Sequence, residues 1–124
     1  MAIQNWSDNI VVVELADDPQ FTDELTAVTE SLEEKSRHVV LNFAAVGFIN
    51  SSNVAKLLRL RKAINTQQRR LLLCEVNTQV WGVFLVTGLD KIFDFVNDIS
   101  TALASLQLGA AAGKGKNASS RDNG

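Results

Sequence analysis

The sequence lacks several features that mark particular classes of protein. It has one cysteine, Cys74, so neither an intramolecular disulfide nor a cluster of thiolate metal ligands can form. No stretch of about 18 apolar residues runs without a charge, and the first residues are not a basic segment followed by an apolar one. A net charge of −2 over 124 residues gives no overall attraction to nucleic acid. We therefore expect a soluble cytoplasmic protein with no membrane insertion and no nucleic acid partner.

The residues that common catalytic and cofactor sites require are also scarce. The single histidine, His38, has no Gly-x-Ser-x-Gly turn to pair with, so a catalytic triad is not expected. The glycines before residue 109 are Gly47, Gly82 and Gly88, too few for a phosphate-binding or dinucleotide-binding loop. Acidic residues near residue 20 have neither calcium-loop spacing nor histidines beside them. The sequence therefore predicts no catalytic residue, no metal and no cofactor.

Strand-like and helix-like segments alternate regularly along the chain. Short apolar or β-branched runs predict strands over residues 10–15, 39–43, 71–76 and 92–96. Apolar residues at steps of three and four predict helices over residues 19–35, 54–64, 80–87 and 99–108. Because the middle strands are apolar almost throughout, we expect a mostly parallel sheet that is buried on both faces. The chain is thus predicted to be one α/β domain over residues 1–108, followed by a small-residue, disordered tail over residues 109–124.

Residues with cap and turn preferences mark the ends of these segments. Asp18-Pro19 is expected to start the first helix, Gly88 to end the third and Asp98 to cap the last. The helical spacing in the second helix assigns four residues to the core: Val54, Leu57, Leu58 and Ile64.

Three segments carry a recognisable combination: residues 39–52 (VVLNFAAVGFINSS), residues 70–74 (RLLLC) and residues 87–93 (TGLDKIF). In this order and spacing they resemble the STAS domain of bacterial anti-sigma factor antagonists and of the cytoplasmic tails of sulfate transporters. The resemblance spans roughly residues 10–106. It implies a STAS-like fold, with a four- to five-stranded, mostly parallel but mixed sheet and about four helices. The family's second strand and its glycine-containing turn are replaced here by Ala16-Asp17-Asp18-Pro19. The resemblance therefore does not predict which strand forms this edge of the sheet.

The turn before the second helix carries the site that this resemblance implies. In the STAS family a serine or threonine at this turn is phosphorylated, and the position falls on Ser52, beside Ser51. The chain has Asn50 where the family usually has aspartate, and Asn53 where it usually has glycine, so the resemblance implies a site whose regulation has changed. Residue preferences alone favour Ser52 as a helix cap, because all four residues from Asn50 to Asn53 favour helix starts. Together with the resemblance, capping and phosphorylation are equally supported, and the two roles can coexist.

Two other features are candidates for binding a protein partner. Lys56 and Arg59 follow Ser52 on a basic helix, where they can meet an acidic partner or a phosphate, or can simply face solvent. Trp81 lies in a short, very apolar helix, and it is either a docking anchor or part of the core.

From the resemblance we expect a non-enzymatic, phospho-regulated switch that binds an anti-sigma factor with serine kinase activity and so regulates transcription. The expected phosphorylation site is Ser52, and the expected partner-binding residues are Asn50, Ser51, Asn53, Lys56, Arg59 and Trp81. Two alternatives stay open: a subunit or adaptor of a lipid-transport, anion-transport or stress-signalling assembly, and a small enzyme on an α/β scaffold. Whether the chain forms a homodimer is also left open.

Overall fold

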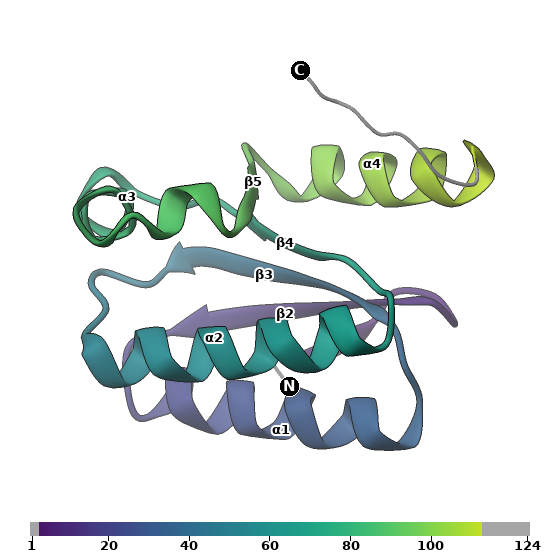
Figure 1. Cartoon of the computed structure of the whole chain (residues 1–124), viewed down its shortest axis with the longest axis horizontal. Helices are drawn as coiled ribbons and strands as arrows, with labels where there is room; N and C mark the ends of the chain where they lie inside the picture. The colour runs from purple at the N-terminus through teal and green to yellow at the C-terminus, as the bar shows by residue number, and fades with distance from the viewer. Residues whose placement is uncertain (1–2, 113–124) are drawn as a thin grey trace.

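A computed structural model describes residues 3–112, with side chains from residue 3 to residue 108 (Figure 1). Within this range the chain forms five strands: β1 (Ile3–Asn5), β2 (Ile10–Ala16), β3 (His38–Ala45), β4 (Leu71–Cys74) and β5 (Asp94–Val96). The same range contains four α-helices and one 3₁₀-helix: α1 (Gln20–Glu34), α2 (Ser51–Thr66), α3 (Thr78–Thr87), η1 (Leu89–Lys91) and α4 (Ile99–Ala112). Strands and helices therefore alternate as the sequence predicts.

The strands form one mixed sheet in the order β1-β2-β3-β4-β5. β2 to β5 are parallel, whereas β1 runs antiparallel to β2 with Ile3 opposite Val13. The predicted α/β class, with a mostly parallel but mixed sheet, is confirmed. The sequence does not predict β1, because three residues carry little periodicity and the strand is held by pairing with β2. β1 forms the outer edge of the sheet, and residues 16–19 lead directly into α1.

Both faces of the sheet are buried, and alternate residues of each strand point to opposite faces. In β2, Val11 and Val13 join the core formed with α1, α2 and α3, whereas Ile10 and Val12 join the core formed with α4. Figure 1 shows α1 and α2 side by side and α4 across the molecule from them. This two-sided burial explains the nearly unbroken apolar runs in the middle strands.

One prediction about the core face of α2 is wrong. Leu58 is 36% exposed, and Leu60 is fully buried in its place. The inward stripe is Asn53, Leu57, Leu60 and Ile64. Helical spacing allows either Leu58 or Leu60 to share a buried face with Leu57 and Ile64. Packing of α2 against α1 and the sheet selects Leu60.

Several element boundaries also differ from the predictions. β4 ends at Cys74, because the next residue, Glu75, has a φ of 60° and leaves the extended conformation. η1 ends at Lys91, and the next residue, Ile92, still has helical dihedral angles (φ −97°, ψ −41°), so β5 begins only at Asp94 and not at the predicted residue 92. α4 continues to Ala112, past the predicted end at Leu108, and the rest of the expected tail lies outside the described residues. Over the described residues, no helix has both the length and the apolar character needed to cross a bilayer.

Candidate functional site

The candidate site lies where the loop after β3 turns into α2. Asn50 is the N-cap of α2, and its side-chain oxygen accepts a hydrogen bond from the Asn53 backbone N–H at 2.8 Å. The Asn53 side-chain oxygen in turn accepts from the Asn50 backbone N–H at 3.0 Å. This reciprocal capping box satisfies two backbone N–H groups that the helix itself leaves unpaired.

Asn53 also joins the start of α2 to the start of α1. It is 3% exposed, and its side-chain amide donates to Asp18 at 2.9 Å. The other oxygen of the Asp18 carboxylate accepts from the backbone N–H and the hydroxyl of Thr22, at 3.0 and 2.7 Å. These hydrogen bonds, that from Asn53 foremost, lower the pKa of Asp18 below its ordinary value of 3.8, and the positive charge of Lys56 adds to the effect.

The loop that precedes α2 is anchored on both sides by side chains from neighbouring loops. The Asp17 carboxylate accepts from the Gly47 backbone N–H at 2.9 Å, and the Asn77 side-chain amide donates to the Val46 carbonyl at 2.8 Å. Directly after these two anchored residues, Phe48 is 63% exposed. The fixed loop therefore presents an aromatic ring to solvent.

Ser51 and Ser52 lie in the first turn of α2, after the N-cap, and both are exposed. The interpretation of Ser52 as the helix cap is wrong, because Asn50 makes that hydrogen bond. The Ser52 hydroxyl instead accepts from the Lys56 ammonium, one helical turn later, at 2.8 Å. This hydroxyl is therefore accessible, has no part in capping and lies beside a positive charge.

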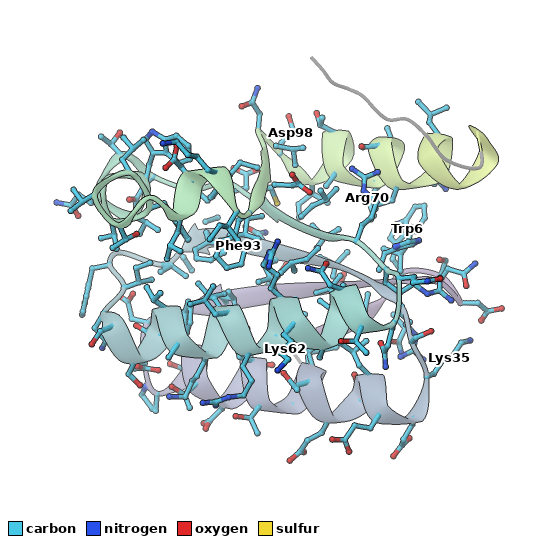
Figure 2. The ribbon with its side chains drawn as sticks, viewed as in Figure 1. Trp6, Lys35, Lys62, Arg70, Phe93 and Asp98 are labelled. Atoms are coloured by element: carbon cyan, nitrogen blue, oxygen red, sulfur yellow. The ribbon has the colours of Figure 1, made fainter. Side chains whose placement is uncertain are left out.

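The surface that continues from Ser52 along α2 is basic. Lys56 is half-buried, Arg59 is exposed, and both line a cavity of about 150 Å³ between α1 and α2. Figure 2 shows Lys62, further along α2, beside α1. Among the described residues the only ion pair joins Lys35 and Asp8, so no α1 carboxylate pairs with an α2 cation.

Trp81 lies at a different part of the molecule. It is partly buried in α3 and meets Phe95 of β5 in a T-shaped contact, with ring centroids 4.9 Å apart. The residues that line the hollow beside it come from β5 and the loops around it, and none comes from α2. The structure thus brings Asn50, Ser52 and Lys56 together but does not place Trp81 with them.

Sequence reasoning did not single out Phe48, although it belongs to the segment that resembles STAS domains. No sequence signal predicts this exposure: alternation from the buried Val46 would place Phe48 inward too, but the chain has already left β3, and Ile49 is buried in its place. Leu85 and Val86 on α3 are likewise exposed, by 50% and 88%. No group of three or more His, Cys, Asp or Glu side chains within the described residues is arranged to hold a metal ion.

Comparison with known proteins assigns this arrangement to a family. The STAS domain family model matches residues 9–102. The chain belongs to the STAS domain family. The "putative anti-sigma factor antagonist BtrV" of Bordetella bronchiseptica is 30% identical over 96 residues, covering 77% of this chain and 80% of BtrV.

Solved STAS structures show the same fold at lower identity. An anti-sigma-factor antagonist (STAS) domain protein from Planctomyces limnophilus matches with a TM-score of 0.72 and 20% identity, covering 85% of this chain and 97% of that one. The Bacillus cell fate determinant SpoIIAA, in its phosphorylated form, matches with a TM-score of 0.66 and 15% identity, covering 83% and 95%. The five-stranded mixed sheet and four helices of this STAS protein are thus those of its structural neighbours.

Proposed function

We propose that this STAS protein is a non-enzymatic anti-sigma factor antagonist whose partner docks on the start of α2 and is released when Ser52 is phosphorylated. The accessible Ser52 hydroxyl, outside the capping box and 2.8 Å from the Lys56 ammonium, carries the proposal. The partner is an anti-sigma factor with serine kinase activity, so the consequence of binding is a change in transcription.

Phosphorylation of Ser52 adds charge where the fold tolerates it. A phosphoserine carries about −1.5 to −2 charges at pH 7. The N-terminus of a helix has a partial positive charge, and the first turn of α2 contains no acidic residue. Lys56 is already in contact with the serine oxygen and can pair with the phosphate. The modification therefore changes the surface and leaves the capping box intact.

The surface around Ser52 suits a partner with apolar and acidic groups. Phe48 offers an exposed ring two residues before Asn50, and Arg59 extends the positive charge along α2. Buried aromatic and arginine side chains contribute much of the free energy at protein interfaces. A phosphate placed beside such a contact repels acidic groups and is costly to desolvate against apolar ones.

The comparisons support this assignment over a transport or stress-signalling adaptor. BtrV and the Planctomyces protein are both named as anti-sigma factor antagonists, and SpoIIAA, which has the same fold, has been solved with its phosphate. The adaptor alternative was favoured by two departures from the family pattern, Asn50 and Asn53. Because the Asn53 side chain is turned inward, we propose that it positions the Ser52 turn and makes no contact with the partner.

The test is an affinity pull-down from the source cell with wild type, Ser52→Ala and Ser52→Asp, with bound proteins identified by mass spectrometry. We expect wild type and Ser52→Ala to retain a kinase-like anti-sigma factor and Ser52→Asp to lose it. Thr66→Asp is the matched control, because it adds the same charge at the last residue of α2, at the opposite end from the proposed docking surface. Equal retention by all variants, or capture of a transport component in place of the kinase, would contradict the proposal.

A further inference from the structure

A second hollow lies outside the carboxyl ends of β4 and β5. Its volume is about 450 Å³, and it is lined by Glu75, Val76, Trp81, Phe95, Val96 and Asn97. Beyond these two strands the chain continues into α3 on one face of the sheet and α4 on the other; in Figure 2, Asp98 marks the start of α4. Ligands of open α/β sheets commonly bind beyond the carboxyl ends of the strands. The hollow also has the size of a small-molecule or side-chain pocket.

Four of the six residues that line the hollow are aromatic or apolar, and Glu75 and Asn97 make the rest of its wall polar. Trp81 and Phe95 meet at an interplanar angle of 86°, so Phe95 covers at most one face of the indole. The two valines among the lining residues are partly buried. An aromatic face attracts a cation that sits above it, and planar guanidinium groups also stack on such faces.

The only charged residue that lines the hollow is Glu75, and it is exposed. None of the six lining residues is basic. The adjacent Cys74 thiol has its pKa raised to about 12, mainly by burial and further by the negative charges of Glu75 and Asp98. The electrostatic field at this corner of the sheet therefore favours a cation.

The backbone fixes Glu75 in an unusual conformation. Its φ of 60° lies in the left-handed region, which residues other than glycine, asparagine and aspartate seldom occupy. Its N–H donates to the Asn97 carbonyl at 3.2 Å, which ties the loop after β4 to the loop after β5. Strained residues of this kind are concentrated at sites that hold ligands.

We propose that this hollow binds the guanidinium group of an alkylguanidine. The Glu75 carboxylate accepts hydrogen bonds from the guanidinium, the indole of Trp81 stacks on it from the wall of the hollow, and Val76 and Val96 contact the alkyl chain. An arginine side chain of a partner protein and a free alkylguanidine share this chemistry. The site is independent of Ser52, so its failure would leave the phospho-switch untouched.

Tryptophan fluorescence tests the site directly, because the chain has two tryptophans and the other, Trp6, is 43% exposed and not in the hollow. In a Trp6→Phe background Trp81 is the only indole. The probes are an acetylated Gly-Arg-Gly amide, agmatine, and the same tripeptide with citrulline, which is neutral and nearly the same shape. We expect a saturable change in Trp81 emission. Half-saturation should occur at about 1–10 mM for the better guanidinium probe, because a single side chain offers few contacts.

Charge at Glu75 gives the second readout. Glu75→Gln should weaken binding by about fivefold, the upper range for an exposed ion pair. Glu33→Gln, which removes the same charge from an exposed position on α1, should leave it unchanged. Tighter binding of the tripeptide identifies a protein side chain as the ligand, and equal or tighter binding of agmatine identifies a free alkylguanidine. A non-saturable response, an equal response to citrulline or no effect of Glu75→Gln overturns the site.

Discussion

Two helices on the same face of the sheet, α1 and α2, start in opposite electrostatic surroundings. Their first turns lie together, since Asn53 of α2 donates to Asp18 just before α1, and their ends meet where Gln67 donates to the Leu32 carbonyl. α1 contains five carboxylates and no cation, whereas α2 contains four cations and no carboxylate. α1 has an acidic residue in its first turn, and α2 has only neutral amides and serines there. The positive end of α2 is thus available for an added negative charge.

The largest effect on this comparison should come from removing the link between the two helices. Asn53→Ala deletes half of the capping box and leaves the Asn50 N–H and one Asp18 oxygen without their partner. We expect the free energy of unfolding to fall by about 2 kcal/mol, from a lost cap and unsatisfied polar groups. Urea unfolding measures the change. Asn65→Ala, on an exposed face of α2, is the control, and an equal loss there would show that the capping box is not special.

A negative charge at the open end of α2 should stabilise the helix. Ser52→Asp places a carboxylate in the first turn and four residues before Lys56, so we expect the free energy of unfolding to rise by about 0.3–1 kcal/mol. Thr66→Asp adds the same charge at the last residue of α2 and should lower it. The two variants should converge in high salt. Destabilisation by Ser52→Asp would contradict the idea that phosphate is tolerated there.

Titration of Asp18 reports on its hydrogen bond with the Asn53 side chain. Its pKa in the folded protein lies below the ordinary 3.8, so its contribution to stability is present above that value and is lost as the pH falls through the folded pKa. In Asn53→Ala, which removes the leading cause, the pKa of Asp18 should rise toward 3.8, as followed by NMR of the carboxyl carbon. Asp98, whose pKa is lowered by hydrogen bonds from Thr101, should titrate unchanged. An unmoved Asp18 would assign its shift to Thr22.

The smallest effect should follow from the charges across the two helices. Glu30 lines the same cavity as Lys56 and Arg59 but forms no ion pair with either. Glu30→Gln should therefore lower the free energy of unfolding by no more than about 0.5 kcal/mol, as for exposed charges. Glu34→Gln, exposed and outside the cavity, sets the background. If Glu30→Gln, but not Glu34→Gln, lowered the free energy of unfolding by more than about 1 kcal/mol, charge attraction between α1 and α2 would be a main source of their packing stability.

The fold could be predicted largely from sequence because its signals are local. The strand of residues 71–74 is apolar throughout, and the cap of α4 is a single aspartate, Asp98, whose side chain accepts from the Thr101 N–H at 2.7 Å as expected. β1 could not be predicted, since its pairing with β2 is tertiary. The choice between Leu58 and Leu60 was likewise made by packing against neighbours, which periodicity does not describe.

The site was only partly accessible to sequence reasoning. The motif that resembles STAS domains pointed to Ser52, but four consecutive residues with similar cap preferences do not reveal which one caps. The inward turn of Asn53 depends on Asp18, which lies 35 positions earlier in the chain. Glu75, similarly, takes its importance from a backbone conformation that its residue type does not suggest.

The capping box at residues 50 and 53 has an evolutionary consequence. If Ser52 receives the signal as proposed, capping of α2 and phosphorylation belong to different side chains within one turn, so substitutions at residues 51 and 52 leave the capping box intact. A lineage can therefore lose, move or reinvent its phosphoacceptor while keeping the same stable domain. Paralogues that share this asparagine pair should accordingly diverge in their regulation faster than in their thermal stability.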